Sequence, residues 1–377
     1  MARVNAQHPA GPSSSPGPVR ATSTLATEAT SEGGPPGAGP LRTLSADCYT
    51  SPAHHEAERR AIFGREWLLV ARSPQLVAPG DYVAVDVCGW PIVVVVDGGR
   101  TLRAFHNVCR HRAGPLVWDG AGSCPTFVCR YHGWAYGLDG SLRSARDFGA
   151  GADLDSSDMG LLPVAVGTWR GLVFINVDTG ARPLAEALAP FAAECASLPI
   201  EELTFTHHAV QDIDANWKTY ADNYLEGYHI PLVHRELNRE IDASRYEVTV
   251  GDRYCRHCAP ARDGAVNSGV WLWRWPNLAL NVYPDAMNIE CFWPLGAHQT
   301  RVSYSYFFRD VGPSARPANA EVVRLSATVL DEDRTICEAV QRNLDAGAYL
   351  GGRLSPRHEQ GVAAFQRWVR EATGRCS

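Results

Sequence analysis

Two short Cys–His motifs between Phe105 and Gly140 limit the folds open to this chain more than any other feature. Cys109-x-His111 is followed, after residues 112–128, by Cys129-x2-His132. The residues between the motifs form short strand-like runs separated by Gly, Pro and Asp, with no helical pattern. The four side chains are therefore predicted to lie on loops of a domain made mostly of strands.

Thiolate and imidazole side chains at this spacing predict a metal site. Two Cys and two His can hold tetrahedral zinc, so zinc is one interpretation. Here, however, each pair joins one Cys to one His and no helix lies between the pairs. That arrangement favours a Rieske [2Fe-2S] centre, in which one iron takes two thiolates and the other takes two imidazoles. The predicted cluster ligands are Cys109, His111, Cys129 and His132.

A second group of candidate ligands follows residue 216. A helix predicted from about residue 216 to 228 places Glu226 and His229 on one face, three residues apart. Pro231 ends that helix, so His234 must return from a turn to reach His229. Two histidines and one carboxylate complete a facial triad for non-haem iron(II), with positions left open for oxygen.

Asp333 is the carboxylate predicted to complete this triad. It falls in the apolar stripe of a helix predicted over residues 318–344, whereas Asp331 and Glu332 are rotated away from it. A buried carboxylate without a partner costs several kcal/mol, so Asp333 needs a cation, which iron would provide. The stripe comprises Val322, Leu325, Val329, Ile336, Val340 and Leu344. The alternative cation is an arginine of the same helix, Arg334 or Arg342.

Both regions resemble the Rieske non-haem iron oxygenases, large (alpha) subunits, over about residues 46–375. The first motif of that family is C-x-H-x(15–17)-C-x2-H, and the flanking sequences CRHR and YHGW agree as well. Ala113 departs from the glycine usual in the family, although a small residue is expected to fit. The second motif is [DE]-N-x2-[DE]-x-Y-H-x4-H. It is matched by Asp222, Asn223, Glu226, Tyr228, His229 and His234.

The predicted fold is α+β, in two domains after a tail. Residues 1–45 are rich in Pro, Gly, Ser and Ala and are predicted to be disordered. Residues 46–182 form a β-rich Rieske [2Fe-2S] domain, and residues 183–377 form a helix-grip-like catalytic domain, an antiparallel sheet with helices. The strands expected in that second sheet are Thr204–Ile213, Tyr246–Arg253, Val270–Trp275, Asn288–Trp293 and Thr300–Phe308.

The resemblance implies a role for each site residue. A mononuclear non-haem Fe(II) would be held by His229, His234 and Asp333. Glu226 would bridge a cluster histidine of one subunit and an iron-binding histidine of the next, and Asn223 would lie near the iron. Tyr228 is expected to pack behind the site.

The resemblance also implies partners. The chain would be a terminal oxygenase component that forms a homotrimer and uses O2. Its electrons would come from a separate NAD(P)H-dependent flavin/iron-sulfur reductase, directly or through a ferredoxin, since the sequence has no nucleotide-binding motif of its own.

Within the family, Glu226 and the sequence YLEGYH look most similar to the choline, glycine-betaine and carnitine monooxygenases. This similarity predicts hydroxylation or N-demethylation of a small quaternary ammonium or N-methyl compound. Trp271, Trp273 and Trp275 alternate along a predicted strand and share one side, where indole faces would attract such a cation. The alternative is that they form an ordinary hydrophobic core contact. Asn281, Asn288 and Glu290 could orient a polar group of the substrate.

Two other functions remain open from the sequence. One is an aromatic-ring hydroxylase or O/N-demethylase of the same family, and the other is a Rieske electron-transfer or zinc-binding protein without catalytic iron. The 35 basic and 41 acidic side chains give a net charge of −6, which argues against a nucleic-acid partner. No apolar run is long enough to span a membrane. The odd number of cysteines, 11, without an apolar signal segment, predicts a cytoplasmic protein.

Overall fold

The computed structural model describes residues 41–149, 158–262 and 269–375. Most of the tail predicted to be disordered therefore lies outside the described residues. Within the described part of the chain, no helix has both the length and the apolar character that crossing a membrane requires.

The first half of the described chain is built on a seven-stranded sheet in the order β1-β10-β9-β4-β3-β2-β5, in which all neighbours are antiparallel. Its strands are β1 (Leu68–Arg72), β2 (Asp81–Val87), β3 (Trp90–Val96), β4 (Leu102–His106), β5 (Gly120–Ser123), β9 (Pro163–Trp169) and β10 (Leu172–Asn176). A smaller sheet contains β6 (Phe127–Val128), β7 (Ala135–Tyr136) and β8 (Leu142–Ser144). The second Cys–His loop connects β6 to β7.

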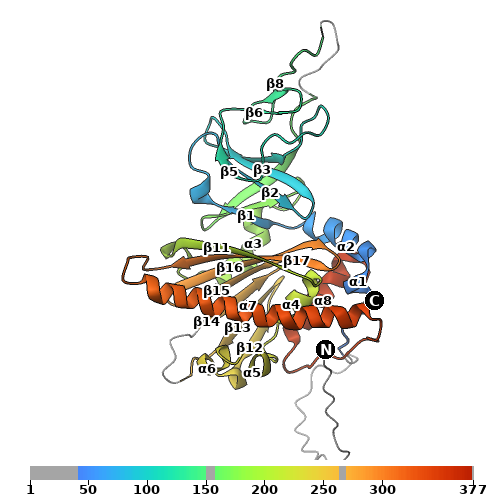
Figure 1. Cartoon of the computed structure of the whole chain (residues 1–377), viewed down its shortest axis with the longest axis vertical. Coiled ribbons are helices and arrows are strands. Elements are labelled where there is room, and N and C mark those ends of the chain that lie inside the picture. Colours follow the sequence, from blue (N-terminus) through green and yellow to red (C-terminus); the bar gives the residue numbers. More distant parts are fainter. Residues whose placement is uncertain (1–40, 150–157, 263–268, 376–377) are drawn as a thin grey trace, which may run out of the picture. The chain divides into compact units, whose positions relative to one another are not determined.

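The second half is a seven-stranded antiparallel sheet with helices packed against it (Figure 1). Its strand order is β11-β17-β16-β15-β14-β13-β12, so each neighbour after β17 is the preceding strand in the sequence. The strands are β11 (Thr204–Ile213), β12 (Glu247–Val250), β13 (Tyr254–Ala259), β14 (Gly269–Arg274), β15 (Leu278–Val282), β16 (Ala286–Gly296) and β17 (Gln299–Phe308). The α+β fold predicted from the sequence is confirmed.

Eight α-helices belong to the described residues. Two short ones precede β1: α1 (Asp47–Thr50) and α2 (Pro52–Glu58), the latter continued by a π-helical turn over Arg59–Phe63. The others are α3 (Leu184–Glu194), α4 (Trp217–Tyr224), α5 (Ile230–Val233), α6 (Leu237–Glu240), α7 (Arg316–Asp345) and α8 (Gln360–Thr373). The candidate iron ligands lie at the two ends of α5, where His229 precedes it and His234 follows it, and on α7.

Three element predictions are wrong in detail. The strand predicted over Tyr246–Arg253 ends at Val250, because the chain turns there and Arg253 adopts a positive φ of 59°. Neither β13 nor β15 was predicted. All five residues of β15 are buried, so the alternation that marks a half-exposed strand is absent. The third error concerns α4, which ends at Tyr224 rather than near Tyr228.

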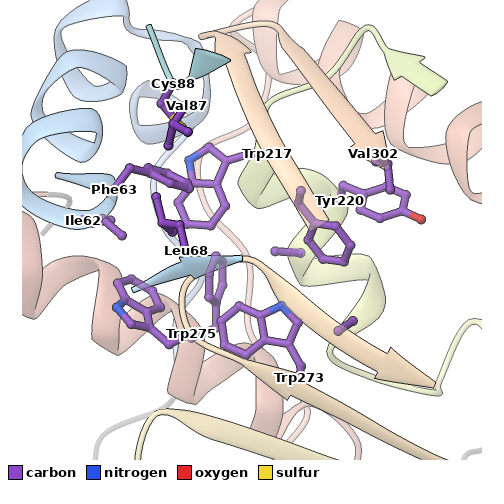
Figure 2. Close-up of a cluster of buried hydrophobic side chains, with 14 of the residues drawn as sticks. Ile62, Phe63, Leu68, Val87, Cys88, Trp217, Tyr220, Trp273, Trp275 and Val302 are labelled. Carbon is purple, nitrogen blue, oxygen red and sulfur yellow. The ribbon is translucent and has the colours of Figure 1, made fainter. Parts of the chain in front are cut away.

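A cluster of aromatic rings fixes the position of α4. Trp217, its first residue, packs edge-on against Phe63 with ring centroids 5.1 Å apart, and against Phe365 of α8 at 5.3 Å. Trp275 lies 6.4 Å from the same indole (Figure 2). Aromatic pairs of this kind each contribute ~0.5–1.5 kcal/mol beyond the area they bury. Helix α4, which precedes His229, is therefore held by the turn Arg59–Phe63, by the residue that follows β14 and by α8.

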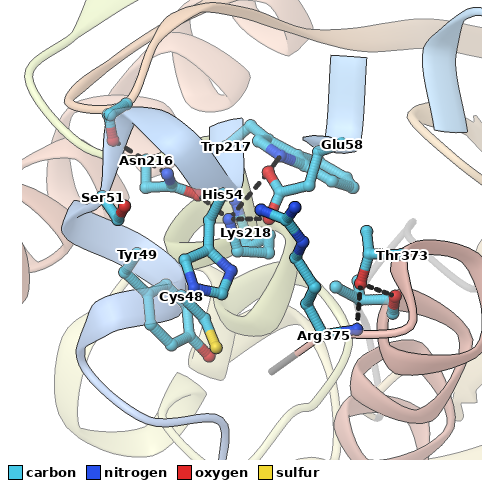
Figure 3. Close-up of polar contacts among 12 residues, drawn as sticks. Cys48, Tyr49, Ser51, His54, Glu58, Asn216, Trp217, Lys218, Thr373 and Arg375 are labelled. Atoms are coloured by element: carbon cyan, nitrogen blue, oxygen red, sulfur yellow. Dashed lines mark hydrogen bonds and ion pairs between the residues drawn. The ribbon is translucent and has the colours of Figure 1, made fainter. Parts of the chain in front are cut away.

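A buried ion pair also ties α2 to α4. Lys218 Nζ lies 2.7 Å from Glu58 Oε1, and the two side chains are 0% and 1% exposed. Lys218 also donates to Asn216 Oδ1 (2.6 Å), and Trp217 Nε1 donates to Glu58 Oε2 (2.8 Å; Figure 3). Because the desolvation of two charges offsets much of their attraction, the pair matters most through the damage caused by losing one partner.

Candidate active site

The two Cys–His loops share one backbone hydrogen-bond pattern. In the first loop, the Cys109 amide donates to the Gly114 carbonyl (2.8 Å) and the Ala113 amide donates to the Cys109 carbonyl (3.0 Å). The second loop repeats both bonds around Cys129, at 2.9 and 2.8 Å. Each loop thus bends back so that its Cys and His side chains point to the same side.

The repeated turn requires a left-handed residue four positions after each cysteine. In the second loop this residue is Gly133, with φ 76°, but in the first it is Ala113, with φ 56°. The methyl group of Ala113 fits, as predicted, yet a left-handed alanine costs ~1–2 kcal/mol that glycine avoids. The departure from the family motif therefore places backbone strain in the first loop.

The side chains of the two loops converge as a metal cluster requires. The rings of His111 and His132 have centroids 4.6 Å apart, and Cys109 and Cys129 lie within hydrogen-bonding reach of each other. His111 Nδ1 is buried and has no hydrogen-bond partner among the described residues. A buried imidazole nitrogen without a partner is unfavourable, and an iron of a bound cluster would accept its lone pair. The donor set, two thiols and two imidazoles, fits a Rieske centre.

Tyr136 is a neighbour of this site that the sequence did not reveal. Its hydroxyl lies 3.3 Å from Cys109 Sγ and accepts a hydrogen bond from the Arg110 amide (3.0 Å). Hydrogen bonds to cluster sulfurs are one determinant of reduction potential.

The second constellation also comes together. One ligand atom from each of His229, His234 and Asp333 lies within 4.8 Å of the others. The two Nε2 atoms are 3.0 Å apart, and Asp333 Oδ1 lies 3.0 Å from His234 Nε2 and 3.7 Å from His229 Nε2. Neighbouring ligands that each lie ~2.1 Å from one metal ion at right angles are ~3.0 Å apart. These three residues could therefore hold a mononuclear metal.

Each histidine of the triad has a carboxylate behind it. His229 Nδ1 lies 2.5 Å from Glu226 Oε1, and His234 Nδ1 lies 2.8 Å from Glu332 Oε2. A carboxylate accepts the Nδ1 proton, which leaves the lone pair on Nε2. Two such lone pairs directed at one point, next to the Asp333 carboxylate, need a cation between them.

Glu332 is a site residue that the sequence pattern does not identify. It lies outside the buried face of α7, as predicted, yet its carboxylate contacts His234. The stripe itself is rotated from the predicted one, because Ile336 and Val340 are each 40% exposed. The residues of α7 that are buried are Leu330, Asp333, Cys337, Gln341 and Leu344. Asp333 is buried as predicted.

Glu226 and His229 come together through a turn and not along a helical face. After α4 ends, the Glu226 side chain accepts hydrogen bonds from the backbone amides of Tyr228 and His229 as well as from the His229 ring. Gly227 lets the ring of Tyr246 approach this turn, because a Cβ there would lie 2.5 Å from that ring. Pro231 does not end a helix but lies in the first turn of α5.

Other motif residues take different positions. Asn223 Nδ2 donates to Asp333 Oδ1 (2.7 Å), which places Asn223 beside the triad as predicted. Asp222 lies away from it: its carboxylate accepts from Tyr49 Oη (2.6 Å), and burial raises its pKa to about 7. Tyr228 does not pack behind the site, because it is 60% exposed and stacks on the ring of His358.

A cavity of ≈ 170 Å³ adjoins the triad and has an aromatic wall. Trp271 stacks on Tyr246 with ring centroids 6.2 Å apart and meets Tyr283 edge-on at 6.2 Å. Of the three alternating tryptophans, only Trp271 lines this cavity. Trp273 and Trp275 pack instead against Phe365 and Trp368 of α8, so for these two the core interpretation is correct.

The strands beside this wall present polar groups to the cavity, since Asn281 of β15 pairs with Trp271 of β14 and with Asn288 of β16. Asn281 donates to Asn288 Oδ1 (2.6 Å) and to Glu290 Oε1, and it accepts from Tyr224 Oη (2.6 Å). Glu290 is 6% exposed, and burial raises its pKa to about 8. All three residues suggested from the sequence therefore line the cavity.

Glu226 and Asn223 line this cavity and also a second one, of ≈ 410 Å³. The second cavity lies over α7, where the exposed side chains of Ile336 and Val340 contribute to its wall. Glu226 therefore lines both the cavity beside the triad and the second cavity, which the triad does not line.

Each half of the chain matches a known domain family. Residues 66–155 match the Rieske [2Fe-2S] domain, and residues 200–264 and 260–375 match the catalytic domain of the ring hydroxylating alpha subunit. The chain therefore belongs to the Rieske non-haem iron oxygenases, and its cofactors are a Rieske [2Fe-2S] cluster and a mononuclear non-haem iron.

Several relatives are similar over most of the chain. Choline monooxygenase of Beta vulgaris, a chloroplastic protein, is 30% identical over 86% of this chain and 75% of its own length. The carnitine monooxygenase oxygenase subunit of Acinetobacter pittii is 31% identical over 85% of this chain and 92% of its own. The solved structure of the quaternary ammonium Rieske monooxygenase CntA with L-carnitine has a TM-score of 0.79 at 30% identity, and covers 89% of this chain and 96% of that one. Another structure of a quaternary ammonium Rieske monooxygenase, with a TM-score of 0.80, describes inter-subunit electron transfer.

Proposed function

We propose that this protein is the oxygenase component of a monooxygenase that hydroxylates or N-demethylates a small quaternary ammonium or N-methyl compound. The reaction would consume O2, two electrons and two protons. One oxygen atom would enter a substrate C–H bond and the other would leave as water. The observation that carries the proposal is the cavity beside the triad, in which aromatic faces and a buried carboxylate provide the complement of an ammonium ion.

We assign Cys109, His111, Cys129 and His132 as cluster ligands. His229, His234 and Asp333 would hold the mononuclear iron. When bound, the cluster supplies single electrons and the iron activates oxygen. Glu226 and Glu332 keep the two imidazoles in the tautomer that leaves Nε2 free for metal. Asn223 orients Asp333 through the hydrogen bond to Oδ1.

Glu226 is also proposed to connect two subunits of a homotrimer. Its carboxylate is bonded to His229 on one side and lines the second cavity on the other, where a cluster histidine of a neighbouring subunit could reach it. The exposed apolar side chains of Ile336 and Val340 beside that cavity support a contact with another subunit. The inter-subunit electron transfer described for a similar enzyme agrees with this arrangement.

The electrons would come from a separate NAD(P)H-dependent flavin/iron-sulfur reductase, directly or through a ferredoxin. We propose a cytoplasmic location, where both reduced nicotinamide and such a reductase are available.

A single-turnover experiment tests the proposed function. The purified holoenzyme is reduced chemically and mixed with oxygen and a pool of ammonium compounds and aromatic acids, and new products are identified by mass spectrometry. We expect a hydroxylated or demethylated ammonium product. A product formed only from an aromatic acid would replace the proposed substrate class. A protein with two irons per chain and no product would be an electron carrier.

A further inference from the structure

In the described part of the chain, the active-site cavity is lined by carboxyl groups but not by lysine or arginine side chains. Among the described residues of its wall, Glu290 is the one carboxylate outside the proposed iron site, and none is a lysine or an arginine. A ligand in this cavity would therefore meet aromatic faces, amides, hydroxyls and carboxylates, but no fixed positive charge apart from the metal.

Glu290 is held firmly in this wall. It lies on β16, directly opposite Tyr304 of β17 in the sheet register, and the Tyr304 hydroxyl donates a hydrogen bond to its carboxylate. Asn281 of β15 donates a second one. Tyr304 is itself bonded to the hydroxyl of Tyr220 at 2.8 Å. These contacts position the carboxyl group through uncharged donors. Burial raises its pKa to about 8, so a cation bound beside it is needed to favour its ionised form.

The aromatic wall is held just as firmly. Trp271 Nε1 donates to Tyr283 Oη (3.1 Å), and the hydroxyl of Tyr246 lies 3.0 Å from Nδ1 of His257, a fully buried ring. The hydroxyls thus have partners away from the ring faces. The faces of these rings attract cations whatever the other groups of the ligand are.

The size of the cavity decides between two kinds of ammonium compound. In a space of ≈ 170 Å³, both ends of a small ligand share one set of walls. A carboxylate attached to the ammonium compound would be desolvated near Glu290 and Asp333 without a lysine or arginine to pair with, which is unfavourable. An alcohol arm carries no such penalty and can use the amides and hydroxyls.

We propose that Glu290 restricts the substrate to compact monocations, namely tertiary or quaternary ammonium compounds without a carboxylate group, and that zwitterions are rejected. This inference rests on the proposed function and sharpens it, since it separates a choline-like substrate from carnitine-like or betaine-like ones. Glu290 acts on specificity and has no part in holding the iron.

Binding measurements test the inference without turnover. Choline and L-carnitine are titrated into the anaerobic holoenzyme by calorimetry, with the wild type, Glu290→Gln and Glu290→Asp. Glu321→Gln, which alters an exposed carboxylate of α7 paired with Arg324, is the matched control. We expect the wild type and the control to bind choline at least tenfold more tightly than L-carnitine. Glu290→Gln should weaken choline binding at least tenfold and erase the preference, while Glu290→Asp should retain part of it.

Two results would overturn the proposal: equal affinity of the wild type for the two ligands, or a preference unchanged by Glu290→Gln. If Glu290→Gln does not fold, the ratio of choline to L-carnitine affinity in the wild type tests the proposal by itself. Failure of the proposed function looks different, because then neither ligand gives an oxidised product in the single-turnover experiment. Turnover of L-carnitine at least as fast as choline would reject the role of Glu290 and leave the enzyme class standing.

Discussion

The two metal-binding regions of this chain are assembled in different ways. The four proposed cluster ligands lie within residues 109–132, on two loops that repeat one pair of backbone hydrogen bonds. The proposed iron ligands come from the two ends of α5 and from α7, about a hundred residues later, and each histidine needs a carboxylate from a different segment. A site on local loops depends on turn geometry, whereas a site between distant elements depends on packing.

This difference decides which changes damage each region. At the cluster loops, backbone conformation is the sensitive variable, as the positive φ of Ala113 shows. At the iron site, the sensitive variables are the carboxylates that hold and orient the imidazoles. Substitutions should therefore affect one region and spare the other.

The largest effect is expected from Asp333→Ala. Losing a partner of a metal ligand already costs ~10–100-fold in affinity or activity, so losing a ligand should cost more than ~100-fold in iron affinity and turnover. Metal analysis should find the mononuclear iron gone and the visible spectrum of the cluster unchanged. Retained iron would transfer the ligand role to Glu332.

Glu226→Gln should keep both metals but reduce turnover by ~10–100-fold, because an amide cannot accept from His229 and from a second histidine as a carboxylate does. Steady-state rates with the reductase and the cluster spectrum are the measurements. Normal turnover would remove Glu226 from the electron path.

Glu332→Gln compares two carboxylates of α7, one that contacts a proposed iron ligand and one that does not. The variant should bind iron ~10-fold more weakly, since His234 would lose the carboxylate that fixes its tautomer. Asp331→Asn is the matched control, because Asp331 pairs with Arg334 on the exposed side of α7. Equal iron affinity in the two variants would contradict the role of Glu332.

Glu290→Gln should change stability with a definite pH dependence. Burial raises the pKa of Glu290 to about 8 from its ordinary value of 4.5, so the folded state retains a proton that the unfolded state releases. The contribution of Glu290 to stability is therefore greatest below pH 4.5 and is lost as the pH rises to 8. The variant should melt at a higher temperature than the wild type at pH 8, and at nearly the same temperature at pH 5. An equal difference at both pH values would mean that Glu290 is not protonated in the fold.

The smallest effect concerns the first cluster loop. Ala113→Gly relieves the left-handed alanine but adds entropy to the unfolded chain, for a net stabilisation of ~0.5–1 kcal/mol. Gly133→Ala makes the reverse change in the second loop and should destabilise by ~1–2 kcal/mol. Thermal unfolding followed by cluster absorbance compares the two. Destabilisation by Ala113→Gly would show that the loop is not strained.

The sequence was sufficient to predict the α+β fold and the convergence of His229, His234 and Asp333, because motif spacing and the burial of one carboxylate constrain them strongly. It did not reveal Glu332, because this residue lies outside the buried face of α7 and meets His234 only through tertiary packing. It also could not separate Trp271 from Trp273 and Trp275. Trp271 and Trp273 share one side of β14 and Trp275 follows it, so the position of α8 decides which of them faces the cavity.

The ion pair between Glu58 and Lys218 limits how the chain can be cut. A fragment that begins at residue 183 would contain α4 and all three candidate iron ligands but would lack Glu58. Lys218 would then lose its carboxylate partner, and Trp217 would lose the Phe63 ring that packs against it. The catalytic half thus depends on α2, which such a cut removes, so the two halves are not separable modules.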